Sequence, residues 1–259
     1  MPDLPNRRLR FSFDKESRNY RIFRRDHLKK LIADVIKTSN LSINSRVLDI
    51  GCGTGKSTIP FARTGAEILG IDISQNMINE AKKVSKAYRN ISYKRVSFEK
   101  AVLPDNYFDL ITSGSSFHWL DRKSAYRKIN KTLKGGGHLA IFWSSGPQRH
   151  TKLSSEVREI YAKHSVTYPK GFSKFESTLL AEIKKSSLFK NLSFRKYQTT
   201  EKYTKRQYLN RFTTLSFIIC MEKNEKEALF KDLRKLLSTY ASPICLQREY
   251  KLILAEKKP

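Results

Sequence analysis

The stretch VLDIGCGTGKST, residues 47–58, decides the fold of this chain. Its first letters are apolar apart from one acid and predict a short buried strand, and the glycines that follow predict a tight loop. The next residues, STIPFART, have the composition of a helix. A strand, a glycine loop and a helix in this order form the start of a βαβ unit.

Two phosphate-binding motifs almost fit this loop, and each fails by one position. A P-loop, G-x-x-x-x-G-K-[ST], would need a glycine where the chain has Ile50. The dinucleotide motif G-x-G-x-x-G would need one where the chain has Lys56. The chain instead has G-x-G-x-G over residues 51–55, preceded by Asp49.

The acid before the loop indicates the kind of ligand. A carboxylate at Asp49 would repel a pyrophosphate but would suit an ammonium group, and S-adenosylmethionine (SAM) carries an ammonium, a sulfonium and a ribose without any phosphate. Asp72 ends the next apolar segment and could accept hydrogen bonds from both ribose hydroxyls. Glu99 follows the segment after that and could lie at the adenine edge. The residues therefore predict SAM as the cofactor.

Strand-like and helix-like segments alternate outward from this stretch. The further strand-like segments are AEILGIDIS (66–74), ISYKRVSFEK (91–100), YFDLITSGSSF (107–117) and HLAIFWSS (138–145). Helix-like segments lie between several of them, and another covers residues 26–39, where the apolar side chains share one face. Alternation of this kind predicts an α/β fold with a doubly wound, mostly parallel sheet, in which ligands bind at the carboxyl ends of the strands.

The pattern changes after residues 146–147, Gly-Pro. The helix-like segments of this half are 151–166, 174–189, 204–221 and 224–241, and the strand-like ones are 192–204 and 245–257. We expect the helices to form a cap and the two late strands to complete a seven-stranded Rossmann-like sheet, at least one of them antiparallel. The expected organisation is a cofactor-covering segment (1–40), a SAM-binding core (41–147) and a helical cap with the late strands (148–259).

The net charge is the unusual global property of the chain. Its 259 residues include 51 Lys and Arg against 24 Asp and Glu, which gives +27. Such a charge attracts polyanions and leaves nucleic acid open as a partner. The cations are spread over the whole length, however, and no nucleic-acid-binding motif accompanies them.

The remaining composition narrows the class of protein. The three cysteines are scattered, which predicts neither a disulfide framework nor a metal site. No apolar run approaches the ~18 residues of a membrane span, and no secretion signal is expected at the N-terminus. We therefore expect a cytoplasmic protein.

The segments DIGCGTG, GIDISQNMINEAKK, FDLITSGSSFHWLD and LKGGGHLAIFW together resemble the class I SAM-dependent methyltransferases. The resemblance covers nearly the whole chain and is closest to the trans-aconitate methyltransferase branch. A Tyr-x-x-x-Arg-Pro element of that branch is matched by Tyr20 and Arg24, but Arg25 stands where the branch has proline. Proline would fix the local turn, so this departure puts the conformation of the element in doubt.

The resemblance implies a role for each matching position. Tyr20 and Arg24 would close over the cofactor, with the arginine near its carboxylate. The glycine loop would line the methionine and the ribose of the cofactor, and the segment after Asp72 would line its adenine. The full set of implied cofactor-binding residues is Tyr20, Arg24, Asp49, Gly51, Cys52, Gly53, Gly55, Asp72, Ile73, Met77, Ser97, Phe98, Glu99 and Ser113.

The acceptor side is less defined. His118 is the candidate general base, needed only if the acceptor must lose a proton, and a packing role is the alternative. Trp119 is a candidate for the substrate pocket or for the wall between sheet and cap. Arg211 and Thr214 belong to a segment that faces the pocket in relatives, where an arginine would suit a carboxylate.

Three functions are compatible with these residues. The first is a methyltransferase that acts on a small-molecule carboxylate or hydroxyl. The second is a methyltransferase for RNA or another polyanion, although no N/D-P-P-Y/F motif and no Pro-Cys pair is present. The third is a SAM-binding protein without catalysis. The sequence predicts no metal and does not indicate an oligomeric state.

Overall fold

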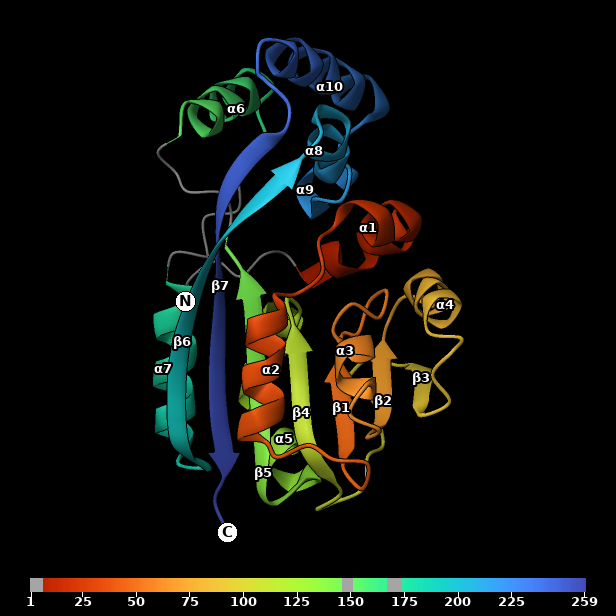
Figure 1. Ribbon diagram of the computed structural model, residues 1–259, viewed down its shortest axis with the longest axis vertical. Coiled ribbons are helices and arrows are strands. Elements are labelled where there is room, and N and C mark those ends of the chain that lie inside the picture. Colours follow the sequence, from red (N-terminus) through yellow and green to blue (C-terminus); the bar gives the residue numbers. More distant parts are fainter. Residues whose placement is uncertain (1–6, 146–150, 167–173) are drawn as a thin grey trace.

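The structure is a computed structural model that describes residues 7–145, 151–166 and 174–259. Its centre is a seven-stranded sheet with the strand order β3-β2-β1-β4-β5-β7-β6 (Figure 1). The strands are β1 (Arg46–Ile50), β2 (Glu67–Asp72), β3 (Ile91–Arg95), β4 (Phe108–Gly114), β5 (Leu133–Ser144), β6 (Phe189–Tyr203) and β7 (Ile244–Lys257). The first five pair in parallel, while β7 is antiparallel to both β5 and β6. The predicted doubly wound, mostly parallel sheet is confirmed.

The central strands are buried on both faces, which explains their nearly continuous apolar runs. Successive residues point to opposite faces, so Val47 and Leu48 of β1 belong to different core clusters. On the Val47 face the core includes side chains of α2 (Lys29–Thr38) and α3 (Thr58–Ala62). On the Leu48 face it includes side chains of α5 (Arg122–Thr132) and α7 (Phe175–Ser186).

The direction of strand order reverses at β1, whose neighbours are β2 and β4. Chain connections diverge at such a point and leave a crevice at the carboxyl ends of the strands. α4 (Gln75–Val84) begins at this rim, where the Ser74 side chain caps its first turn by accepting a hydrogen bond from the Met77 N–H at 3.0 Å.

β6 and β7 extend beyond the sheet as a two-stranded ribbon (Figure 1). The pairing of β5 with β7 ends at Ser144 and Tyr250, while β6 and β7 stay paired as far as Tyr203 and Ile244. The end of this ribbon packs in a separate apolar cluster with α6 (Lys152–Lys163), α8 (Lys205–Phe212), α9 (Ser216–Ile219) and α10 (Lys223–Ser238). The ribbon therefore connects the sheet to the cap helices.

One of the segments expected in the cap lies elsewhere. α7 packs against the sheet, because Leu179 and Ile183 are buried in the same cluster as Leu139 and Ile253 of the central strands. The expected cap over 148–259 is corrected in this respect. The α7 pattern is amphipathic like that of the cap helices, so periodicity alone did not distinguish the two positions.

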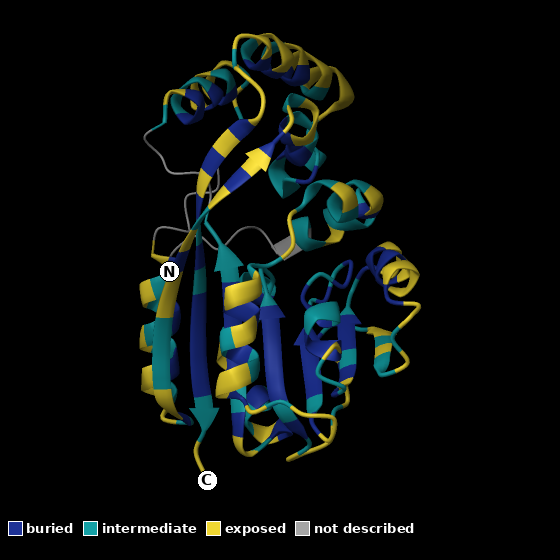
Figure 2. Ribbon diagram, viewed as in Figure 1, coloured by how far each residue is buried: buried dark blue, intermediate teal, exposed yellow. Residues whose placement is uncertain are grey.

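The N-terminal residues divide between two layers. The 3₁₀ helix η1 (Arg7–Asp14) and α1 (Ser17–Phe23) lie near the rim and the cap, whereas α2 covers the sheet (Figure 1). Figure 2 shows the buried strands and the exposed outer faces of α2 and α10. None of the helices in the described part of the chain has the length and apolarity that a bilayer span requires.

Candidate active site

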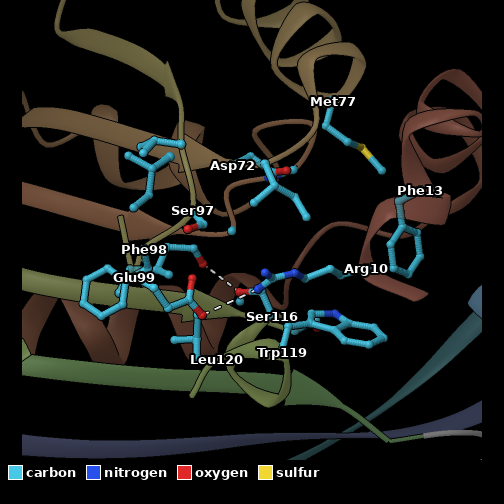
Figure 3. Close-up of a pocket in the computed structure, with 18 of the residues that line it drawn as sticks. Arg10, Phe13, Asp72, Met77, Ser97, Phe98, Glu99, Ser116, Trp119 and Leu120 are labelled. Carbon is cyan, nitrogen blue, oxygen red and sulfur yellow. Dashed lines mark hydrogen bonds and ion pairs between the residues drawn. The ribbon is translucent and has the colours of Figure 1, made fainter. Parts of the chain in front are cut away.

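A pocket of about 740 Å³, its open mouth included, lies at the carboxyl ends of the parallel strands. Its lining combines the loops after β1 to β4 with η1 and α1 (Figure 3). The lining residues are Arg10, Phe13, Tyr20, Ile50, Gly51, Gly53, Ile71, Asp72, Ile73, Met77, Val96, Ser97, Phe98, Glu99, Gly114, Ser115, Ser116, Trp119 and Leu120.

The glycine loop forms one wall, and two of its glycines are required for different reasons. Gly51 has φ +67°, and a Cβ there would lie 2.5 Å from the Cβ of Ser116. Gly53 has φ +52°, and a Cβ there would meet no protein atom within 4 Å. Because Gly53 lines the pocket, that Cβ would take space that a ligand could use.

Asp72, at the end of β2, holds this loop against the start of α4. Its Oδ2 accepts a hydrogen bond from the Gly53 N–H at 2.9 Å, and its Oδ1 accepts one from the Ser74 N–H at 2.9 Å. Burial raises the pKa of this carboxyl, and the two backbone hydrogen bonds oppose that shift. The carboxyl lines the pocket, where its remaining lone pairs could accept hydrogen bonds from hydroxyl groups.

Asp49 does not line the pocket. It is fully buried, and its Oδ2 accepts hydrogen bonds from the Ser57 and Thr58 hydroxyls, each at 2.7 Å. Its Oδ1 accepts one from the Thr112 hydroxyl at 3.1 Å. Burial raises the pKa of Asp49, and these hydroxyls oppose the shift. The Asp49 carboxylate therefore stabilises the glycine loop through these hydrogen bonds and does not face the pocket.

Arg10 reaches across the pocket toward Glu99, as Figure 3 shows. The Arg10 Nη1 lies 3.5 Å from the Glu99 Oε1. The Nε of Arg10 is buried and has no hydrogen-bond partner within the described ranges. Glu99 was predicted from the sequence to lie at this site, but Arg10 was not. Arg10 is one arginine among many in a basic chain, and no sequence pattern distinguishes it from the others.

Aromatic side chains close the side of the pocket opposite Phe98. Phe13 of η1 makes edge contacts with Tyr20 of α1 and with Trp119, at ring-centroid distances of 5.8 and 6.1 Å. Trp119 belongs to the short 3₁₀ helix η2 (Phe117–Trp119) that follows β4. Residues from the N-terminal segment and from the core thus meet at one mouth (Figure 3). Such a cover can exclude water from a bound ligand.

His118 is not among the residues that line the pocket. Its ring contacts Trp119 at a centroid distance of 4.5 Å and Phe175 of α7 at 6.0 Å. Burial, with a smaller contribution from nearby Arg122, lowers the pKa of His118 to about 3. A nitrogen with this pKa is unprotonated at neutral pH but accepts a proton poorly, which disfavours a role as general base.

A second histidine, His27, is half-buried and lies beside one residue of the pocket lining. A Cβ added at Gly114, which lines the pocket, would lie 2.9 Å from the Nε2 of His27. The His27 ring packs edge-on against Phe142 at 4.7 Å. Burial lowers the pKa of His27 to about 4. Its place in the N-terminal segment, far from any strand end in the sequence, gave no signal that it would reach the rim.

Three further residues expected around the cofactor lie behind the lining. The Ser113 hydroxyl is buried 2.6 Å from that of Ser116, which takes its place in the pocket. Cys52 is buried on the side of the loop that faces Gly70. Gly55, with φ +83°, lies against Tyr93 and Ala81 and shapes the loop without touching the cavity.

Arg24 joins the N-terminal segment to the cap. Its Nε donates to the Thr214 Oγ1 at 2.8 Å, and its Nη2 donates to the Thr214 carbonyl at 2.9 Å. The guanidinium also lies over the Tyr20 ring, 5.4 Å from the centroid. Arg25, in the position of the expected proline, lies over the Tyr203 ring and donates to the Lys202 carbonyl. Neither arginine lines the pocket.

Comparisons with known proteins agree with this geometry. Residues 48–141 match the family described as Methyltransferase domain. The uncharacterized methyltransferase YcgJ of Bacillus subtilis is 29% identical over 117 residues, 44% of this chain and 46% of YcgJ. The ubiquinone/menaquinone biosynthesis C-methyltransferase UbiE of Pectobacterium carotovorum is 32% identical over 136 residues, 50% of this chain and 53% of UbiE. The chain thus spans about half the length of the curated relatives it matches.

Solved structures share the fold over most of the chain. The crystal structure of B. subtilis YcgJ superimposes with a TM-score of 0.56 at 20% identity, covering 89% of this chain and 99% of that one. Phosphoethanolamine N-methyltransferase 2 of Haemonchus contortus, in complex with SAM, gives a TM-score of 0.57 at 20% identity, covering 95% and 57%. These structures show the fold, and the family match shows a methyltransferase domain over residues 48–141. These relatives do not bear on the trans-aconitate branch.

Proposed function

We propose that this chain binds SAM and transfers its methyl group to a small-molecule acceptor. The observation that carries the proposal is the pairing of Asp72 with the Gly53 N–H at the edge of the pocket. The Asp72 carboxylate, which could accept hydrogen bonds from ribose hydroxyls, lies beside the two loop residues that line the pocket, Gly51 and Gly53, and neither of these has a side chain. Asp72, Ile73 and Met77 would hold the nucleoside, with Ser97 to Glu99 at the adenine edge.

The cofactor supplies an activated methyl group on a sulfonium. The protein therefore has mainly to align the acceptor with this methyl group and to exclude water. Phe13, Tyr20 and Trp119 would cover the reacting end. A carboxylate acceptor needs no base, which agrees with the weak basicity of His118. Two less favoured alternatives remain. One is a methyltransferase that acts on a polyanion, which the net charge of +27 favours, and the other is a protein that binds SAM without turnover.

The proposal is tested by isothermal titration with S-adenosylhomocysteine (SAH), with ATP and NADH as controls. We expect saturable one-to-one binding of SAH and no binding of either control. A chain that fails to bind SAH, or that binds ATP or NADH equally well, would overturn the assignment of the pocket.

A matched pair of glycine variants locates that binding. Gly53→Ala puts a methyl group into the cavity and strains the backbone, which has φ +52° there. Together these effects should weaken SAH binding at least about tenfold, or about 1.4 kcal/mol. Gly135→Ala, at a position outside the pocket that also has no atom within 4 Å of its Cβ, should leave the affinity unchanged. Equal effects of the two variants would show that SAH binds elsewhere.

A further inference from the structure

A short loop after β3 forms the side of the pocket where the adenine of the cofactor is proposed to lie. Ser97, Phe98 and Glu99 of this loop line the pocket (Figure 3). One turn of backbone hydrogen bonds holds the loop together, because the N–H groups of Lys100 and Ala101 both donate to the Ser97 carbonyl, at 3.1 and 2.9 Å. The loop belongs to no helix or strand, so its other carbonyl groups need donors from elsewhere.

Lys128 of α5 supplies a donor to three of these carbonyl groups. Its Nζ donates hydrogen bonds to the backbone carbonyls of Phe98 at 2.6 Å, Glu99 at 3.1 Å and Ala101 at 2.6 Å. An ammonium group has three N–H donors, so these contacts account for all of them. The same Nζ lies 5.1 Å from the centroid of the Phe98 ring, within the range of a cation–π contact. One side chain thus binds the loop at three backbone positions.

The helix that carries Lys128 is fixed by the core. Its residues Tyr126 and Ile129 are buried in the cluster on the Leu48 face of the sheet. In its first turn, Arg122 forms two hydrogen bonds with Glu182 of α7, at 2.7 and 3.0 Å. Lys128 therefore fixes the loop relative to a helix that is itself held in place by the sheet and by α7.

Lys128 lies behind the wall of the pocket and is not among the lining residues. The loop residues in front of it are Phe98, which is 3% exposed, and Glu99, whose Oε1 lies 3.5 Å from the Arg10 Nη1. Burial lowers the pKa of Lys128, and the charge of nearby Glu99 opposes this shift. Lys128 can therefore affect a ligand only through the position of the loop.

We propose that Lys128 is a positioning residue for the cofactor, because it holds the loop so that the Glu99 side chain meets the amino group of the adenine. The inference rests on the proposed SAM-binding function and adds to it a residue of α5 that does not touch the cavity. A carboxylate accepts a hydrogen bond from an amino group but repels the carbonyl oxygen that replaces this group in a deaminated base. A correctly placed Glu99 would therefore distinguish adenine from hypoxanthine.

The test compares SAH with its deaminated analogue, S-inosylhomocysteine, by isothermal titration of the full chain. We expect the wild type to prefer SAH at least about tenfold, as a hydrogen bond to a charged group implies. Lys128→Met keeps the apolar length of the side chain and removes the ammonium group. It should weaken SAH binding at least about tenfold and reduce the preference to less than about threefold, because the loop no longer holds Glu99 in place.

Lys131→Met is the matched control on the same helix. The Lys131 side chain is 69% exposed, and its partner Asp105, at 3.4 Å, lies at the rim away from the pocket. This variant should keep both the affinity and the preference of the wild type. Lys128→Arg keeps the charge but spreads its donors over a plane, so it should give an intermediate preference. It also serves as the test if Lys128→Met does not fold, and all titrations are run well below the Tm of each variant.

A further variant separates the role of Lys128 from a general loosening of the fold. Glu99→Gln carries an amide that can donate or accept a hydrogen bond, so it should bind both ligands about equally. If Lys128 acts by placing Glu99, adding Lys128→Met to Glu99→Gln should change the preference no further.

The inference is wrong if Lys128→Met binds SAH as tightly as Lys131→Met does. It is also wrong if Lys128→Met binds SAH more weakly but keeps the wild-type preference, or if the wild type binds both ligands equally. Each of these results leaves SAH binding by the wild type intact, and with it the proposed cofactor site. Failure of the wild type to bind SAH would instead overturn the proposed function itself.

Discussion

Asp49 and Asp72 lie in the last two residues of neighbouring strands, yet their carboxylates serve different purposes. Asp49 is enclosed by three hydroxyl groups, from Ser57, Thr58 and Thr112. Asp72 accepts two backbone N–H bonds and also borders the pocket. The register pairs Ile50 with Ile71, so Asp72 lies one residue beyond the last paired position while Asp49 lies one before it. This offset decides which acid can meet a ligand.

The residue-scale prediction concerns Asp72→Ala. The change removes a charged hydrogen-bond acceptor from the ribose position, worth about 2–3 kcal/mol, so SAH affinity should fall about thirty- to a hundredfold. It also releases the Gly53 and Ser74 N–H groups, so Tm should fall as well. Isothermal titration and thermal unfolding measure the two effects.

Glu67→Ala is the control for this substitution. Glu67 begins the same strand, at the rim away from the pocket, and its side chain is 71% exposed. Its replacement should change neither quantity appreciably, because an exposed ion pair contributes little. An Asp72→Ala protein that keeps wild-type SAH affinity would show that the ribose lies elsewhere.

At the scale of elements, η1 and α1 form a cover that is fastened on two sides. On the core side, Asp14 accepts hydrogen bonds from the Ser74 hydroxyl at 2.6 Å and the Asn76 backbone N–H at 3.1 Å, both at the start of α4. On the cap side, Arg24 is held by Thr214. Phe13 and Tyr20 lie in this cover and line the pocket, so we expect the cover to slow the release of a bound cofactor.

The element-scale prediction is that Asp14→Ala loosens this cover. Loss of its hydrogen bonds to α4, at roughly 1–1.5 kcal/mol net, should speed SAH dissociation about five- to tenfold in stopped-flow measurements. SAH should also protect residues 7–25 from limited proteolysis less well in the variant.

Asp105→Ala provides the comparison for the cover. Asp105 pairs with Lys131 at 3.4 Å, is about half exposed and precedes β4 at the opposite rim. Its loss should affect neither dissociation nor proteolysis. If Asp14→Ala and Asp105→Ala release SAH at the same rate, η1 does not control the exit of the cofactor.

For the molecule as a whole, the proposed cofactor site does not explain the net charge of +27. Its cations are distributed among both halves of the chain, and several are paired, as Arg21 is with Glu80 at 2.6 Å. A spread of this kind attracts polyanions at long range without forming a specific site. The structure therefore favours a non-specific electrostatic effect.

The molecule-scale prediction follows from screening. Binding of a short single-stranded RNA, measured by fluorescence anisotropy, should weaken steeply with added salt and be negligible at about 0.15 M ionic strength. Polyphosphate should compete for it as well as RNA does. Submicromolar binding that persists at that ionic strength and resists polyphosphate would instead support the polyanion methyltransferase.

Much of the core site could be predicted from the sequence, because its residues follow strand ends. Asp72, Ile73 and Met77 come directly after one strand, Ser97 to Glu99 after another, and all of them line the pocket. Arg10 and Phe13 were not singled out, because a 3₁₀ segment has no strong periodicity and its contacts are made with distant residues. The burial of Ser113 and Cys52 behind the lining depends on a local direction of the chain that composition does not reveal.

The packing of the cap likewise could not be predicted from the sequence, because it depends on contacts between residues far apart in the chain. Its helices were predicted from periodicity, but the position of α7 on the sheet was not, since an amphipathic helix can bury its apolar face against any matching surface. Arg211 was singled out as a pocket residue, whereas Arg248 and Glu201 belong to a strand pair whose alignment joins residues far apart in the chain. Only the pairing of β6 with β7 brings these two side chains together.

The sequence by itself determined the α/β class, the mostly parallel sheet and the glycine loop with its acid at the end of β2. These depend on local patterns, apolar period and glycine spacing, that one chain segment carries within itself. The tertiary structure decided which of two acids faces the pocket, how the N-terminal cover is fastened, and that Arg248 pairs with Glu201. These depend on contacts across 19 to 190 positions, such as Gly53 with Asp72 and Arg24 with Thr214, and a local pattern cannot specify such contacts.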